Sequence, residues 1–305
     1  MGDLFSNQTE IPWLNSYEKS WKKITQNNKT PHAILISGNR GIGKRAFAAW
    51  LGTEHLDIKT KYEGCIYPFA VPSHADLKWI RPNEGKRDIS VDQIRQIIDD
   101  LTMSSYEGIG KVTVIEPVNK MNISSANSLL KILEEPPGNT LIILIADKMK
   151  NIPATIISRC QHIKIYPPTE DESREFINHI HPDANIGKID PYILVSPLIY
   201  EEQNNHSQNI ESIINDLMSM LNKKNSPLDI AARLSAEEVE IFLDWFSYFI
   251  YSLLRNAYRV NKEQSKFEEI LNKLDICNLF IYFDKINKIR NQPKGSFNFR
   301  MILEE

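Results

Sequence analysis

Residues 124–160 read SSANSLLKILEEPPGNTLIILIADKMKNIPATIISRC, and this stretch decides the fold of the 305-residue chain. Its first part predicts a short amphipathic helix, because apolar residues recur at helical spacing over residues 126–133. We expect Ser124 or Ser125 to cap the helix and the Pro136-Pro137 pair to end it. The uninterrupted apolar run at 141–146 then predicts a strand that is covered on both faces of a parallel sheet.

The stretch ends at Ser158, Arg159 and Cys160, where a helical turn gives way to another strand. Pro153 suits the first turn of that short helix, because its missing N–H is not needed there. Residues 162–165 alternate polar and apolar side chains, which favours a last strand. The arginine should therefore be fixed at a rigid corner between helix and strand.

The strings NSLLKILEEPP (residues 127–137) and SRC (residues 158–160), separated by one buried strand, resemble the signature of the clamp-loader branch of the AAA+ ATPases. The resemblance implies an α/β AAA+ core, which is a P-loop type parallel five-stranded sheet with flanking helices. It also implies that Arg159 of the SRC motif, with Ser158 and Cys160, is an arginine finger that reaches the ATP of a neighbouring subunit. A finger supplied in trans increases turnover on the order of a thousand-fold or more. The alternative is a surface arginine that caps a helix end.

Composition indicates ordinary soluble globular material in two or three domains, with 42% hydrophobic and 25% charged residues. The formal net charge of −3 argues against a protein that coats nucleic acid by bulk charge. Three widely spaced cysteines make a disulfide framework improbable and favour a reducing cytoplasm. We expect a cytoplasmic protein that has neither a signal peptide nor an apolar segment long enough to cross a membrane.

Residues 38–45 (GNRGIGKR) have the position of a P-loop, because an apolar strand pattern precedes them and a helical pattern follows. In a P-loop, backbone N–H groups converge on phosphate, a lysine reaches the terminal phosphates, and a Ser or Thr hydroxyl binds magnesium. Gly38, Gly43 and Lys44 match this pattern, but Arg45 stands at the hydroxyl position, where its charge repels a divalent cation. The sequence allows two outcomes, a weakened ATP site or an inherited loop that stays empty.

Residues 112–117 (VTVIEP) depart from the pattern of an active AAA+ enzyme. The resemblance implies an Asp-Glu pair at the end of this strand, the first for magnesium and the second for the attacking water. Glu116 and Pro117 stand there instead, and proline has no group that could polarise water. We therefore predict that the chain does not hydrolyse ATP by itself. The candidate residues of the degenerate nucleotide site are Gly38, Gly41, Gly43, Lys44, Arg45 and Glu116, and no metal site is predicted.

Pro167-Pro168 predicts the end of the AAA+ ATPase-like domain at residue 167. Residues 168–206 resemble the small helical lid that follows AAA+ cores. In residues 207–305, apolar side chains at helical spacing predict a helical bundle. The resemblance implies that this bundle is a collar, through which loader subunits hold one another in a ring. The expected helices are 210–221, a shorter one at 228–234, 239–258 and 267–289.

A trans-acting arginine combined with a disabled ATP site resembles the delta-prime family of bacterial DNA polymerase III clamp-loader subunits. The resemblance implies a non-hydrolysing stator whose partners are gamma or tau and delta subunits. It also implies that the chain meets the sliding clamp and primed DNA through a complex with DNA-directed DNA polymerase activity. Two alternatives remain: an active gamma-like loader ATPase, and an AAA+ module that binds DNA or protein outside replication. Arg45 and Pro117 weigh against the first alternative.

Overall fold

The computed structural model describes residues 8–26, 30–60, 63–86, 88–146, 149, 152–184, 191–200, 219, 243, 245–251, 253–254 and 275–290. The chain divides into two compact units. The first comprises Met1–Ile189 and Leu194–Ile199, and the second comprises Asp190–Ile193 and Tyr200–Glu305. Among the helices of these described ranges, none has both the length and the apolar content that a membrane crossing requires.

The first unit is built on a five-stranded parallel sheet, which confirms the predicted core. Every residue of the two central strands is buried, as the apolar runs in the sequence predict. These strands pair in register, with Leu35 opposite Leu144. The strands stand in the order β4 (Leu77–Ile80), β5 (Lys111–Ile115), β6 (Thr140–Ala146), β2 (Ala33–Ser37) and β7 (Gln161–Lys164).

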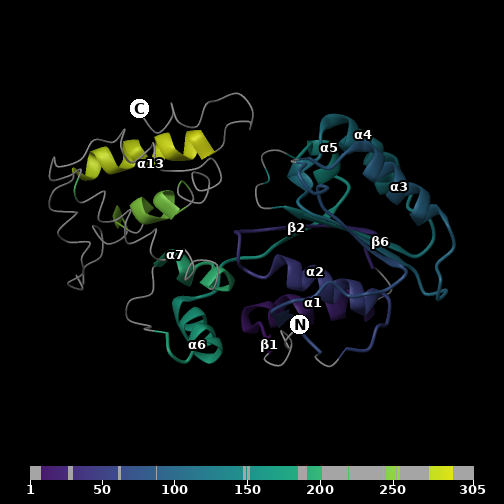
Figure 1. Ribbon diagram of the computed structural model, residues 1–305, viewed down its shortest axis with the longest axis horizontal. Helices are drawn as coiled ribbons and strands as arrows, with labels where there is room; N and C mark the ends of the chain where they lie inside the picture. Colours follow the sequence, from purple (N-terminus) through teal and green to yellow (C-terminus); the bar gives the residue numbers. More distant parts are fainter. Residues whose placement is uncertain are drawn as a thin grey trace. The chain divides into compact units, whose positions relative to one another are not determined.

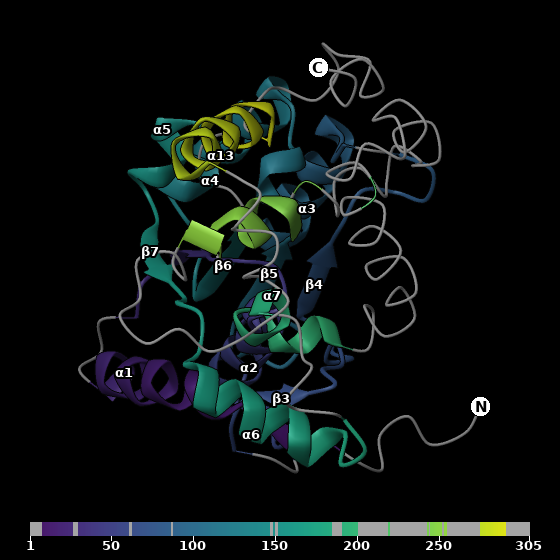
Figure 2. The ribbon, with the colours of Figure 1, turned by 90° about the vertical axis from the view of Figure 1, so that its left-hand side faces the viewer.

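Helices cover both faces of this sheet (Figures 1 and 2). Side chains alternate along β2, so that Ile34 and Ile36 join one apolar core and Leu35 joins the other. Because both cores are apolar, the sheet is a buried middle layer. One face packs against α1 (Asn15–Gln26) and α2 (Lys44–His55), and the other against α3 (Val91–Thr102), α4 (Ile123–Glu134) and α5 (Ala154–Ile157).

The start of α4 differs from the prediction. Its N-cap is Asn122, whose side-chain oxygen accepts the backbone N–H of Ser125 at 2.8 Å. The prediction of Ser124 or Ser125 as the cap was wrong, because Asn122 caps the helix two to three residues earlier and both serines lie within its first turn. Ser125 is instead fully buried, and its hydroxyl donates to the Ile89 carbonyl at 2.9 Å.

A small antiparallel sheet of β1 (Thr9–Glu10) and β3 (Ile66–Tyr67) is an element that the sequence analysis did not predict. β1 precedes α1, whereas β3 lies in the polar connection after α2, next to the buried Cys65. The backbone N–H of Cys65 donates to Glu18 Oε1 at 2.7 Å. Burial and the adjacent Glu18 carboxylate raise the pKa of the Cys65 thiol, so this cysteine behaves as a core side chain.

The helix that follows the sheet belongs to the same unit. α6 (Glu170–Ile180) begins with a capping box between Thr169 and Glu172. Its Phe176 packs edge-on against Trp13 of η1 (Pro12–Leu14), with ring centroids 4.9 Å apart. The Ser173 hydroxyl donates to the Leu194 carbonyl, and the short η5 (Pro197–Ile199) comes next along the chain.

In the second unit the structure describes α13 (Ile276–Arg290) and helical residues 245–251. Trp245 and Phe249 stack with ring centroids 5.1 Å apart, and Ser247 Oγ lies 3.3 Å from Asn287 Oδ1. The expected helices at 210–221 and 228–234 lie outside the described residues, apart from residue 219. The division at residues 167 and 206 stays a prediction.

Asp76 fixes the connection between α3 and β5. Its buried carboxylate accepts the backbone N–H of Tyr106 at 2.8 and 2.9 Å and that of Glu107 at 3.1 Å. Burial opposes ionisation, but these hydrogen bonds and the nearby His74 and Lys111 lower the pKa of Asp76. The charged form is therefore favoured in the folded chain.

We expect Asp76→Asn to lower the free energy of unfolding by about 1–3 kcal/mol at pH 7, because its NH2 group faces backbone donors. The folded pKa lies below the unfolded value of about 3.9, so the contribution is present above that value and is lost as the pH falls through the folded pKa. Urea unfolding at several pH values should show that the difference in unfolding free energy between Asp76→Asn and the unmodified chain shrinks below about pH 4. Asp92→Asn, at an exposed position of α3, is the control, and a pH-independent difference would contradict the assigned role of Asp76.

Candidate functional site

The predicted P-loop connects β2 to α2 and is packed by side chains of its own chain. Gly41 and Gly43 have φ of 74° and 94°, which favour glycine. A Cβ on Gly41 would lie 2.5 Å from Ile199 Cγ2, and one on Gly43 would lie 2.9 Å from Leu14 Cδ1. Internal packing therefore requires both glycines, whether or not a nucleotide binds.

Two segments distant in sequence also bind the carbonyls of this loop. The Trp13 indole N–H donates to the Ile42 carbonyl at 2.9 Å. The backbone N–H of Leu198 donates to the Gly41 carbonyl at 3.1 Å. The loop is thus held between η1 and η5.

Lys44 is buried at the first position of α2. Its ammonium donates to the carbonyls of Gly38 and Asn39, at 2.8 and 2.6 Å. The structure therefore brings Gly38 and Lys44 together within the loop. A phosphate would have to compete with these two carbonyls for the lysine.

Glu116 follows β5 and lies at the carboxyl edge of the sheet, with its side chain 5% exposed. Its Oε1 forms an ion pair with Arg45 Nε. Its Oε2 accepts the Trp79 indole N–H at 2.9 Å and the Arg81 Nε–H at 3.1 Å. The ends of β4 and β5 and the start of α2 thus form one cluster, which we call the Glu116 cluster: Arg45, Trp79, Arg81 and Glu116.

The Glu116 cluster does not fit a magnesium site. Magnesium demands near-octahedral oxygen ligands, but both carboxylate oxygens already accept N–H groups. The guanidinium groups of Arg45 and Arg81 would repel a divalent cation beside them. Pro117 supplies no polar side-chain group in compensation. The residues of the cluster therefore do not fit a magnesium ion at this loop.

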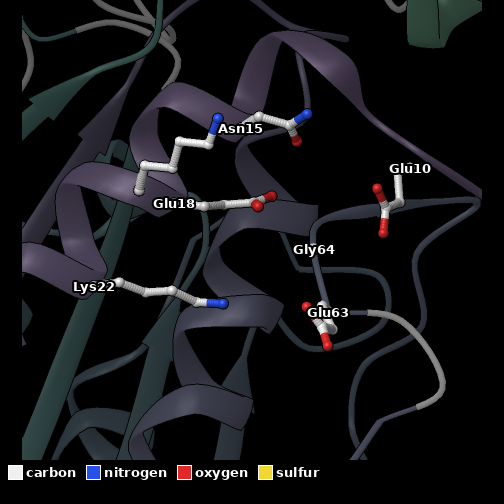
Figure 3. A pocket seen from close by; sticks show the side chains of 7 residues that line it. Glu10, Asn15, Glu18, Lys22, Glu63 and Gly64 are labelled. Carbon is white, nitrogen blue, oxygen red and sulfur yellow. The ribbon is translucent and has the colours of Figure 1, made fainter.

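A pocket of about 240 Å³ lies between α1 and residues 63–64, and it contains none of the predicted nucleotide-binding residues (Figure 3). A Cβ on Gly64 would lie 3.1 Å from Glu18 Oε2, and Figure 3 shows the Glu18 side chain among the lining residues. Three glutamates outnumber two lysines in its lining, which disfavours an anionic ligand, so we assign the pocket no role in binding nucleotide. The lining residues are Glu10, Asn15, Glu18, Lys19, Lys22, Glu63 and Gly64.

Arg159 follows α5 and is held at the surface between α4 and α5. Its Nε donates to Glu134 Oε1 at 2.7 Å, and its Nη2 forms an ion pair with the same oxygen. Its Nη1 donates to the Thr155 carbonyl at 2.9 Å and lies 3.4 Å from Ser158 Oγ. The side chain is 34% exposed. The arginine does contact the end of α5, as the alternative expects, and it is also accessible from outside.

The neighbours of Arg159 shape the corner on which it stands. The exposed Ser158 donates to the Thr155 carbonyl at 3.1 Å. Cys160 packs against the core beneath α4, and burial raises the pKa of its thiol to about 12. Because the thiolate is the reactive form, Cys160 is not a nucleophile near neutral pH. Within the SRC motif, only the arginine presents a charge.

Sequence reasoning missed three residues of these sites. Arg81 comes directly after a strand of the same sheet as Glu116, and carboxyl ends of parallel strands share one edge, so this position could have been found. Trp79 belongs to that strand but carried no signal of its own. Glu134 lies inside the NSLLKILEEPP string, yet only the three-dimensional structure shows that it meets Arg159.

A parallel sheet with a glycine-rich loop and the NSLLKILEEPP and SRC segments around its central strand defines an AAA+ protein of the clamp-loader class. The family model described as DNA polymerase III, delta subunit, matches residues 13–169, and the chain belongs to that family. Within it the chain is a delta-prime-like clamp-loader subunit, which confirms the resemblance found in the sequence.

The relatives agree with this assignment. The DNA polymerase III subunit delta' of Pseudomonas aeruginosa is 27% identical over 257 residues, which cover 80% of this chain and 77% of the relative. The corresponding subunit of Haemophilus influenzae is 24% identical over 262 residues, which cover 83% and 80%. DNA polymerase III subunit gamma of Buchnera aphidicola subsp. Schizaphis graminum is 33% identical, but over 50% of this chain and 43% of the relative.

Proposed function

We propose that this chain is a non-hydrolysing subunit of the bacterial DNA polymerase III clamp loader, which supplies Arg159 to the ATP of a neighbouring gamma or tau subunit. The observation that carries the proposal is the Glu116 cluster. Arg45 and Arg81 bind the carboxylate that would otherwise hold magnesium. The chain therefore lacks the means to hydrolyse ATP but keeps an accessible arginine.

The chemistry of Arg159 supports a role in trans. A guanidinium stabilises the charge that develops on the transferring phosphoryl group, and it needs to be placed rather than activated. Arg159 is one-third exposed at a corner set by α5 and β7. A neighbouring subunit can reach it there without any unfolding of this chain.

The partners follow from the same proposal. Gamma or tau receives the arginine, delta completes the loader, and the sliding clamp and primed DNA are met through the complex. Residues 168–206 are a helical lid in this scheme, and residues 207–305 form the collar that joins the subunits. The site of action is the cytoplasm, in a complex with DNA-directed DNA polymerase activity.

The first test is ATP turnover by the purified chain. We expect phosphate release with magnesium and ATP to be no faster than that of the Lys44→Ala variant, which controls for contaminating ATPases. The physical reason is that the Glu116 cluster excludes the metal and Pro117 cannot activate water. Turnover that is clearly faster in the unmodified chain than in Lys44→Ala would favour the gamma-like ATPase alternative.

The second test addresses an AAA+ module outside replication. Size-exclusion chromatography with light scattering should find no stable homohexamer of the isolated chain. Mixing with gamma or tau and delta should yield a larger hetero-oligomer. A homohexamer that ignores these subunits would contradict the proposed partners.

A further inference from the structure

Glu134 and Arg159 form an ion pair between two segments of the clamp-loader signature. Glu134 is the last residue of α4, and Arg159 stands 25 positions later, beyond β6 and α5. One carboxylate oxygen, Oε1, faces both Nε and Nη2 of the guanidinium. The opposite nitrogen, Nη1, is bound to the Thr155 carbonyl. Both edges of the planar group are therefore held by its own chain.

We propose that Glu134 is the positioning residue for Arg159, which sets the guanidinium in the orientation that meets the phosphate of the neighbouring subunit. This inference rests on the proposed function of Arg159 and adds a residue to it. Glu134 itself makes no contact with the nucleotide under this proposal. It acts only through the arginine.

The physical basis is preorganisation. A free arginine side chain samples many rotamers, and binding a phosphate would remove that freedom at the moment of reaction. Glu134 and Thr155 remove most of it beforehand, because their oxygens accept N–H groups from Nε and Nη1 and the Glu134 carboxylate also forms an ion pair with Nη2. An Nη2 hydrogen beyond these contacts stays available for a phosphate oxygen, on a side chain that is one-third exposed. The arginine can thus bind phosphate with little further loss of side-chain conformational entropy.

The negative charge of Glu134 works in the opposite direction, because it repels phosphate. That repulsion is weakened by solvent, since the Glu134 side chain is 49% exposed. The hydrogen bonds from an oriented guanidinium to phosphate form at contact distance, where solvent does not screen them in this way. We therefore expect positioning to outweigh repulsion.

The test uses the reconstituted loader and three variants of this chain. Glu134→Ala should lower kcat for ATP at the site served by Arg159 about two- to five-fold, the range expected when one partly exposed ion pair is removed. KM for ATP and assembly should stay unchanged. Glu134→Gln should keep most of the rate, because its amide oxygen still accepts N–H groups. Glu135→Ala, at the exposed next position, is the matched control and should have no effect.

The Arg159→Ala background separates this inference from the proposed function. There, Glu134→Ala should cause no further loss, and an equal loss would assign Glu134 a purely structural role. A rise in kcat for Glu134→Ala alone would identify the carboxylate as a competitor of phosphate and overturn the inference, as would an unchanged kcat. If Arg159→Ala itself changes nothing, the proposed function fails.

A readout on the isolated chain does not depend on ATP at all. Nitrogen-15 NMR of the Arg159 Nε–H group should show faster exchange with solvent in Glu134→Ala than in the unmodified chain, by about the same two- to five-fold factor. The Glu135→Ala control should leave that exchange rate unchanged. Equal exchange rates in the chain and in Glu134→Ala would overturn the inference even if Arg159 is the finger.

Discussion

Replacing Arg159 with alanine is expected to slow ATP hydrolysis at the adjoining gamma or tau site about a thousand-fold, the lower end of the effect of an arginine finger. The charge on the transferring phosphoryl group would lose the stabilisation that the Arg159 guanidinium supplies. Assembly should survive, because the guanidinium is one-third exposed and its contacts lie within its own chain. Single-turnover hydrolysis in the reconstituted loader measures the effect directly, since steady-state rates also include the other sites.

Two further variants sharpen this experiment. Arg159→Lys keeps a charge but loses the planar fork that binds phosphate through two N–H groups, so an intermediate rate is expected. Arg95→Ala removes an arginine on α3 that is 67% exposed, and the rate should not change. An intact complex in which Arg159→Ala hydrolyses ATP at the normal rate would exclude the trans role.

The sheet could be predicted because its strands carry strong local signals. Residues 141–146 and 33–36 are uninterrupted apolar runs bounded by turn residues, and they lie in the fully buried β6 and β2. The helix before β6 is equally plain in its spacing, and only its cap was misplaced. Asn122 could have been preferred, since asparagine is at least as good an N-cap as serine.

Other features depend on contacts between distant segments and leave little local trace. β1 and β3 are two residues long and are joined across more than fifty positions. Too few residues are involved for a period of two to appear in the sequence. The hydrogen bond from the Trp13 indole to the Ile42 carbonyl also leaves no local trace. The sequence predicts only that Trp13 packs in the core and does not reveal its hydrogen-bond partner.

The candidate site lies between these two cases. Arg45 and Pro117 are visible as departures from a nucleotide-binding pattern, and from them the sequence predicts a defective metal site. The sequence does not reveal that Arg45 binds Glu116 and that Arg81 joins it. Arg45, which stands where a P-loop has Ser or Thr, thus places a guanidinium at the Glu116 carboxylate, where the pattern would place magnesium. The Glu116 cluster is consequently expected to stabilise the fold, and removing its cations tests this.

We expect the double variant Arg45→Ala/Arg81→Ala to lose about 3 kcal/mol of unfolding free energy, the lower end of the cost of stranding a buried charge. The lower end applies because the two arginine side chains are 54% and 45% exposed, whereas that of Glu116 is 5% exposed. Urea unfolding followed by circular dichroism measures the loss. Adding Glu116→Gln should recover most of it, because a neutral amide costs less to bury than an unpaired carboxylate. If the double variant were as stable as the unmodified chain, Glu116 would not depend on these cations, and the argument that they replace magnesium would fail.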